Sequence, residues 1–180
     1  MVCDRCIMVV KQQLENLGFS VSDIVLGKVV IDPEPDEYQM LQIASALRHI
    51  GFDLINNEKQ QIIEQIKNIV IDKIHHTDLS GGAANFSQLL SSVINKEYGF
   101  LSRLFSQSEG TTIEKFIIRQ KIEKAKELLE YGELNLNEIS YKLGYSSSAY
   151  LSTQFKNITG LTPKQYKLLN NAVRSQLDKI

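Results

Sequence analysis

Two cysteines near the start of the chain have the spacing of a metal-binding pair. Cys3 and Cys6 lie three residues apart, directly before the apolar periodicity of residues 7–17, which predicts a helix. The amino terminus of that helix and the charge of Arg5 both favour the thiolate form of cysteine. Two such thiolates can chelate one soft ion, and copper(I), zinc, cadmium and mercury(II) all suit these ligands. Two alternatives stay open: a redox dithiol without metal, and two small residues that only begin a helix.

Two neighbouring histidines are further candidate ligands. His75 and His76 end a helix that is predicted by the apolar residues between 62 and 74. An imidazole could complete a three- or four-ligand zinc site if this helix folds back on Cys3 and Cys6. The alternative is a pair of surface histidines that complement the negative end of the helix dipole.

The segment that carries the cysteines has a mixed pattern of helices and strands. We predict a helix over residues 7–17, a hairpin over 19–31 that turns at Gly27-Lys28, a helix over 40–50 and a short last strand over 52–55. The residues expected to face inward are Ile7, Val10, Leu14 and Leu17 in the first helix and Met40, Ile43, Leu47 and Ile50 in the second.

This first segment resembles the heavy-metal-associated domain of copper chaperones and metal-pumping ATPases. In that family M-x-C-x-x-C precedes a helix, as Met1, Cys3 and Cys6 do here. The resemblance covers residues 1 to about 56 and implies an α+β, ferredoxin-like domain over residues 1–58, with Met1 beneath the metal. The family fold begins with a strand before the motif. We therefore expect a domain that lacks its first strand, through truncation of the chain start or a sheet that is completed differently, or one that is less stable than its relatives.

The distribution of charge separates the chain into two parts. Residues 1–59 contain five Lys/Arg and nine Asp/Glu, a net charge of −4, whereas residues 60–180 contain fifteen and twelve, a net charge of +3. The basic part is the one expected to face an anionic partner. No apolar run is long enough for a membrane span and no secretory signal is present, so we expect a cytoplasmic protein without a membrane partner.

The second part of the chain contains an internal duplication. Residues 101–116, LSRLFSQSEGTTIEKF, align with residues 151–166, LSTQFKNITGLTPKQY, at an offset of 50. A short predicted helix precedes each copy, at residues 86–95 and 136–143. Each unit therefore reads as helix, short turn, helix, glycine, helix, in an all-α domain over residues 86–170. Residues 59–85 form a connecting helix and linker, and residues 171–180 a C-terminal helix or tail.

One helix in each unit has an outward face suited to a DNA groove. Leu151 and Phe155 point the second helix inward, and small or hydroxyl-bearing residues let a helix lie deep in a major groove. Arg103 has the forked geometry that reads guanine. The alternatives are ordinary solvated faces on two packed helical hairpins. The candidate DNA-binding residues are Gly99, Ser102, Arg103 and Ser106 in the first unit and Ser148, Ala149, Ser152, Thr153 and Lys156 in the second.

Residues 86–167 resemble the DNA-binding domain of AraC-type regulators. The resemblance rests on LSRLF at 101–105 with Gly110, on KIEKAKELL at 121–129, and above all on EISYKLGYSSSAYLSTQFKNITGLTPKQYK at 138–167. It implies two helix-turn-helix units joined by a long helix, Ile113–Tyr131, which places the recognition helices in successive major grooves about 34 Å apart.

The resemblance also implies roles for single residues. Gly99, Ser102 and Arg103, with Ser148, Ala149, Ser152 and Thr153, take the base-facing positions, and Lys156 neutralises a phosphate. Two positions depart from the family pattern: Lys121 stands where arginine is usual, and residues 94–97 lack the usual glycine turn.

Together these features predict a transcription regulator rather than an enzyme. The expected partners are double-stranded DNA, the transcription machinery and a second copy of the chain, with a soft metal ion at Cys3 and Cys6 as the signal. The first alternative is a metal chaperone, thiol carrier or redox sensor whose helical half docks a protein. A DNA-alkylation-repair regulator would need four cysteines, and no Ser-His-Asp set, P-loop or carboxylate pair suggests catalysis.

Overall fold

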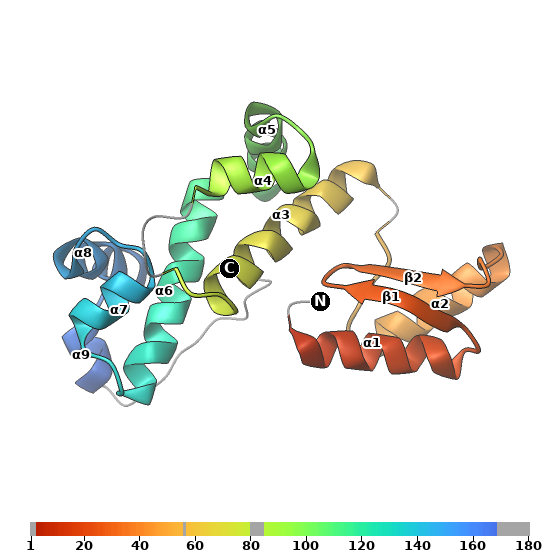
Figure 1. The fold of residues 1–180 in the computed structure, drawn as a ribbon, viewed down its shortest axis with the longest axis horizontal. Coiled ribbons are helices and arrows are strands. Elements are labelled where there is room, and N and C mark those ends of the chain that lie inside the picture. Colours follow the sequence, from red (N-terminus) through yellow and green to blue (C-terminus); the bar gives the residue numbers. More distant parts are fainter. Residues whose placement is uncertain (1–2, 56, 80–84, 169–180) are drawn as a thin grey trace. The chain divides into compact units, whose positions relative to one another are not determined.

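In the computed structural model, the structure describes residues 3–55, 57–79 and 85–168. They divide into two compact units, Met1–Asn68 and Ile69–Ile180, and the division falls inside one helix. The elements are α1 (Asp4–Asn16), β1 (Ser20–Val25), β2 (Lys28–Asp32), α2 (Glu37–His49), α3 (Glu58–His75), α4 (Phe86–Ile94), α5 (Tyr98–Glu109), α6 (Ile113–Tyr131), α7 (Leu136–Lys142), α8 (Ser148–Thr159) and α9 (Pro163–Leu168) (Figure 1). The predicted helix or tail over 171–180 and most of the predicted linker lie outside the described residues.

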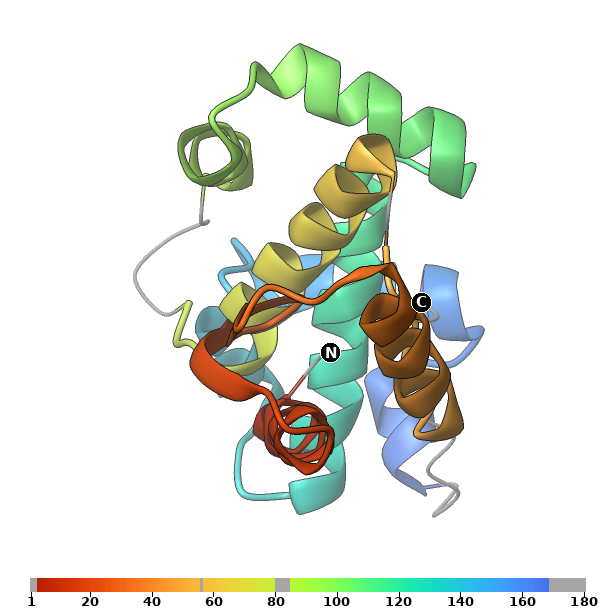
Figure 2. The same ribbon diagram turned by 90° about the vertical axis from the view of Figure 1, so that its right-hand side faces the viewer.

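The first unit is built on an antiparallel hairpin with a bulge. The register shifts between Val21 and Asp23, so Val21 opposite Ile31 and Ile24 opposite Val29 all pack against the core. A bulge adds one residue to a strand, and two residues that are three apart then share a face. Helices α1 and α2 lie on the same side of this hairpin (Figure 2). The buried residues of this core are Val10, Leu14, Phe19, Ile43 and Leu47.

The helix-strand-strand-helix order of the first unit is confirmed, but its predicted last strand is wrong. Residues 52–55 run as irregular chain, although Phe52 and Leu54 still pack on the core. The sheet of the described residues has two strands, so a ferredoxin-like fold is not confirmed. Two inward assignments were also wrong. Leu17 is exposed because α1 ends at the residue before it. Met40 is exposed at the start of α2, and the residues of this helix that are buried are Ile43 and Leu47.

The second unit is all helical, and α6 is its central element. Figure 1 shows α6 with α4 and α5 at one end and α7, α8 and α9 at the other. Its bounds, Ile113–Tyr131, agree with the prediction because Thr112 caps its start and Gly132, at a φ of 70°, ends it.

None of the helices in the described part of the chain has the length and apolar character needed to cross a membrane.

The duplication in the sequence is also a duplication in the packing. Phe105 contacts Phe116 with ring centroids 5.6 Å apart, and fifty residues later Phe155 contacts Tyr166 at 5.4 Å. Each pair fastens the second helix of a unit to the helix that follows it. Gly110 and Gly160 end α5 and α8 in the left-handed region, which glycine adopts without strain. Both helix-turn-helix units thus have the predicted order of helix, turn, helix, glycine, helix.

Candidate nucleic-acid interface

Helices α5 and α8 are the elements that carry the predicted DNA-binding residues. Each is 12 residues long and follows a short turn after the preceding helix. In α8 the Ser147 hydroxyl accepts a hydrogen bond from the Tyr150 amide, which fixes the start of the helix. In the first helix-turn-helix unit, Asn95 ends α4 with a φ of 55°. Asparagine tolerates this left-handed conformation, so it makes the turn for which the family uses glycine.

The nine candidate residues all lie on unburied faces of these two helices. The opposite faces are closed by Leu101 and Phe105 in α5 and by Leu151 and Phe155 in α8, all with no exposed surface. The exposed candidates are Gly99, Arg103, Ala149, Thr153 and Lys156, and the partly exposed ones are Ser102, Ser106, Ser148 and Ser152. Their contact with DNA stays a prediction, but each can be reached from solvent.

Local hydrogen bonds hold several of these side chains against their own helix. Arg103 Nε donates to the Gly99 carbonyl at 3.2 Å, a bond that uses neither Nη nitrogen. Arginine reads guanine with a fork of N–H donors, so the terminal nitrogens stay suited to this contact. On α8 the hydroxyls of Ser152 and Thr153 donate to the carbonyls of Ser148 and Ala149 at 2.8 and 3.0 Å. Their oxygens can then accept bonds from base amino groups.

Comparison with known proteins agrees with this arrangement. Residues 90–168 match a family model described as a helix-turn-helix domain. Two solved structures share the fold. The first is the C-terminal domain of AraT, a response regulator from Geobacillus stearothermophilus, with a TM-score of 0.53 and 24% identity over 67% of this chain and 95% of that one. The second is a transcriptional regulator from Chromobacterium violaceum, described among AraC-type DNA-binding domain-containing proteins, with a TM-score of 0.50 and 18% identity over 58% of this chain and 91% of that one. Residues 90–168 therefore match a helix-turn-helix domain and share the fold of these two structures.

Curated relatives resemble this domain and part of the chain beside it. The Escherichia coli (strain K12) xylose operon regulatory protein is 40% identical over 73 residues, which cover 41% of this chain and 19% of that protein. A Staphylococcus aureus uncharacterized HTH-type transcriptional regulator is 30% identical over 129 residues, 71% of this chain and 16% of that protein. The second match is longer than the helix-turn-helix domain, so it includes residues outside 90–168. The chain spans less than a fifth of the length of either relative. The helix-turn-helix domain predicted from the sequence is thus confirmed over residues 90–168.

Hydrogen bonds between helices orient the two helix-turn-helix units on α6. Tyr98, in the first turn of α5, donates to Glu114 on α6 at 2.5 Å. Burial and the neighbouring carboxylate raise the pKa of Tyr98, and the hydrogen bond from Tyr98 lowers the pKa of Glu114. In the second helix-turn-helix unit, Tyr166 on α9 donates a hydrogen bond to Glu130 on α6 at 3.0 Å. Sequence reasoning missed these pairs, because residues 16 and 36 positions apart show no local pattern that joins them.

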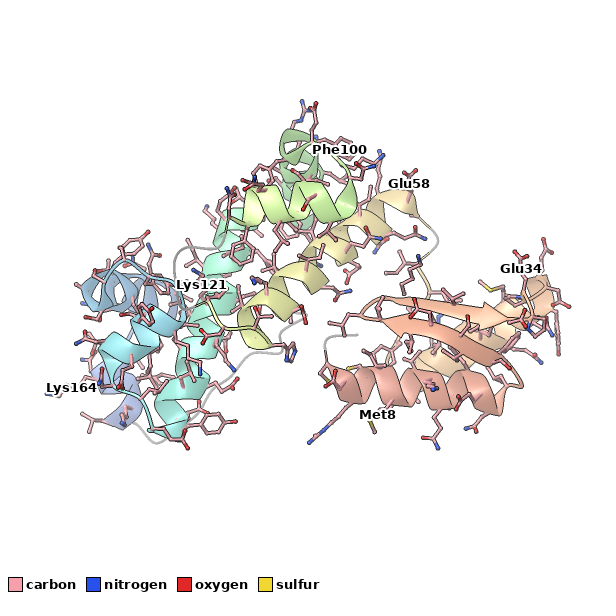
Figure 3. The ribbon with its side chains drawn as sticks, in the orientation of Figure 1. Met8, Glu34, Glu58, Phe100, Lys121 and Lys164 are labelled. Carbon is pink, nitrogen blue, oxygen red and sulfur yellow. The ribbon has the colours of Figure 1, made fainter. Side chains whose placement is uncertain are left out.

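Lys121 occupies the buried junction at which the family usually has arginine. Its ammonium nitrogen lies 5.0 Å from the centre of the Tyr145 ring, on the loop between α7 and α8 (Figure 3 labels Lys121). Burial lowers the pKa of Lys121, because the charged form is less well solvated there. A cation over an aromatic face is attracted by the ring electrons, so this contact joins α6 to the loop in place of forked hydrogen bonds.

The cysteine pair lies at the start of α1, in the first unit. Cys3 is the residue that caps α1, and its sulfur lies 3.4 Å from the sulfur of Cys6, with both side chains partly buried. Met1, expected beneath the metal, lies outside the described residues. Within residues 3–55, 57–79 and 85–168, no three side chains of His, Cys, Asp or Glu gather closely enough to hold a metal ion.

The first of the two candidate histidines makes a contact in the second unit. His75 Nε2 lies 3.0 Å from Gln120 Oε1, so the end of α3 is hydrogen-bonded to the middle of α6. Burial lowers the pKa of His75 to about 4, which keeps the ring neutral at physiological pH. The bond to the amide oxygen places the proton on Nε2 and leaves Nδ1 as the nitrogen that could bind a metal. Metal binding by His75 and His76 stays a prediction.

Proposed function

We propose that this chain is a transcription regulator that binds double-stranded DNA with α5 and α8 in successive major grooves. The observation that carries the proposal is the repeated face of these helices. In each, leucine and phenylalanine close the inner side, and small, hydroxyl-bearing or cationic residues occupy the outer side. Side chains of this kind let a helix backbone approach base edges closely.

The size of α6 supports this reading. It has 19 residues, and at the usual rise of an α-helix it is about 28 Å long. This length is close to one turn of the double helix, about 34 Å, which separates successive major grooves on one side of DNA. Because both units pack on α6, its length sets the separation of the two recognition helices.

The charge of the recognition helices is also suited to DNA. Helix α8 contains Lys156 and no acidic residue, and α5 contains Arg103 with a single acid, Glu109, as its last residue. An acidic residue among the base-facing positions would repel phosphates, so its absence there favours an anionic partner. The xylose operon regulatory protein and the staphylococcal HTH-type transcriptional regulator, named above, support a role in transcription.

The test is selection of duplexes from a random DNA pool, followed by affinity measurement at several salt concentrations. We expect one preferred sequence and an affinity that falls steeply as salt rises, because bound phosphates release counterions. Thr153→Glu, which adds a negative charge to the exposed face of α8, should weaken binding at least tenfold. Gln12→Glu, an equal charge change on the exposed side of α1, should leave it unchanged. Equal binding by all three proteins, or no salt dependence, would instead favour a metal chaperone or thiol carrier that docks proteins.

We further propose that Cys3 and Cys6 bind a soft metal ion that alters DNA affinity. Two sulfurs 3.4 Å apart lie within the span of one ion with metal–sulfur bonds of about 2.3 Å. Copper(I), zinc, cadmium and mercury(II) are all compatible with this donor pair. Metal binding would order the start of α1 and change the packing of α3 and thereby the DNA-binding units. Dimerisation and contact with the transcription machinery stay predictions.

The metal proposal has a separate test. DNA affinity of the apo, copper(I)-loaded and zinc-loaded protein should differ about fivefold or more for the effective ion, the low end of ordinary allosteric coupling. The double variant Cys3→Ser, Cys6→Ser should bind DNA as the apo protein does and lose the response. Identical affinities for all three loaded states would refute the coupling and leave the DNA proposal intact.

A further inference from the structure

Each recognition helix carries an exposed aromatic residue at the same position. Phe100 is the third residue of α5 and Tyr150 the third residue of α8, fifty positions apart, and they are 40% and 49% exposed. Phe100 is labelled on α5 in Figure 3. Neither residue was selected from the sequence as a DNA contact, because that selection favoured hydroxyls, small residues and cations.

The position of Phe100 places it beside the base-facing side of α5. It precedes Arg103 by three residues, and residues three apart are neighbours on a helix surface. The inner side of α5 is already filled by Leu101, Leu104 and Phe105. Phe100 also lies in the first turn, and the first residues of a recognition helix are the ones that reach base edges. Its exposed ring is therefore placed to contact a base when α5 enters the groove.

The two aromatic residues differ in their surroundings. The ring of Tyr150 is packed edge-on against Tyr145, with centroids 5.8 Å apart. The residue fifty positions before Tyr145 is Asn95, so Phe100 lacks the corresponding aromatic neighbour. In addition, three residues join α4 to α5, whereas five join α7 to α8. Phe100 therefore has no counterpart of the contact between Tyr145 and Tyr150, and 40% of the residue stays exposed to a partner.

We propose that Phe100 is a specificity-determining residue that selects thymine in the first half of the DNA site, through contact with the thymine 5-methyl group. This inference rests on the proposed DNA binding. Thymine is the base that presents an apolar group in the major groove, and phenylalanine is an established type of partner for that methyl group. Because Arg103 is adjacent, the selected thymine lies within a base pair or two of the guanine that Arg103 reads.

The test removes single methyl groups from the DNA. In a duplex selected from a random pool, each thymine is replaced in turn by deoxyuridine, which differs only in lacking the 5-methyl group. For the wild-type chain, one replacement close to the Arg103 guanine should weaken binding about fourfold, equivalent to about 0.8 kcal/mol for one buried carbon group. Phe100→Ala should bind the unmodified duplex about fourfold more weakly and be insensitive to that replacement. Phe100→Leu, which keeps an apolar side chain, should recover part of the sensitivity.

Tyr131→Ala is the matched control. Tyr131 is also an exposed aromatic residue, but it is the last residue of α6 and belongs to neither recognition helix. This variant should keep the wild-type affinity and the full response to deoxyuridine. The inference is overturned if Phe100→Ala responds to every replacement as the wild type does, or if the wild type responds to none. If the wild-type chain binds no duplex from the pool, the proposed function fails as well.

Discussion

Acidification should lower the free energy of unfolding of the second compact unit, residues 69–180, because His75 becomes protonated. Its Nε2 lies 3.0 Å from Gln120 Oε1, and Gln120 has no exposed surface. The pKa of His75 is lowered from 6.5 to about 4, mainly by burial. Lys124 and His76 contribute to this decrease, and the Gln120 hydrogen bond and Glu127 oppose it. An unfolded chain takes up a proton near pH 6.5, whereas the folded chain resists protonation until about pH 4.

The sign and size of the effect follow from this difference. Between these two pH values the unfolded state binds more protons, so the free energy of unfolding falls as pH decreases. From about pH 7 to about pH 5 the loss from His75 alone is roughly 2 kcal/mol, and below about pH 4 it approaches roughly 3 kcal/mol. The stability is fully present above pH 6.5, where histidine is neutral in both states.

The assay is urea unfolding of the full chain at several pH values, with His75→Gln as the control. Glutamine keeps a donor for Gln120 but does not titrate, so the variant should lack this part of the pH dependence. Nuclear magnetic resonance should also show a His75 ring that titrates well below the ordinary range. If His75 titrates near 6.5, or if wild type and variant lose equal stability between pH 7 and pH 5, the buried neutral histidine is refuted.

Three substitutions in the helix-turn-helix domain have distinct expected effects. Arg103→Ala should cost about 1–3 kcal/mol in DNA binding and relax the preference for guanine at one position, as measured by competition between base-substituted duplexes. Lys156→Gln should weaken binding to all sequences similarly and reduce the slope of log affinity against log salt by about one; an unchanged slope would argue against a phosphate contact. Asn95→Ala should lower the unfolding free energy by about 1 kcal/mol in thermal denaturation, since alanine is strained at a φ of 55°, whereas Asn95→Gly should not. Equal stability of the two Asn95 variants would contradict this account of the turn.

The sequence predicted the second unit in more detail than the first. The fifty-residue repeat located α5, α8 and the glycines that end them, because both copies repeat the same buried leucine and phenylalanine positions. The bounds of α6 followed from a family resemblance, and in the structure Thr112 and Gly132 cap its two ends. Local patterns of this kind record which side of a helix is buried, so they also separate the inner residues from the outer ones.

The sequence could not predict features that depend on neighbours distant along the chain. The apolar residues Phe52 and Leu54 suggested a strand, but they pack on the core from an irregular segment without joining the sheet. The contacts of His75 with Gln120, Tyr98 with Glu114 and Lys121 with Tyr145 join residues 16 to 45 positions apart.

The single helix α6 makes the geometry of the DNA site depend on residue number. Each residue in an α-helix adds about 100° of rotation and 1.5 Å of length. Inserting one residue in the middle of α6 would therefore turn one recognition helix by more than a quarter circle with respect to the other, away from the face of the duplex that its partner reads. An insertion that restores the angle must add about seven residues, two helical turns, and it would move the two half-sites apart by about 10 Å, or three base pairs. Relatives with the same recognition residues but a longer central helix are thus expected to require a different spacing in their operators.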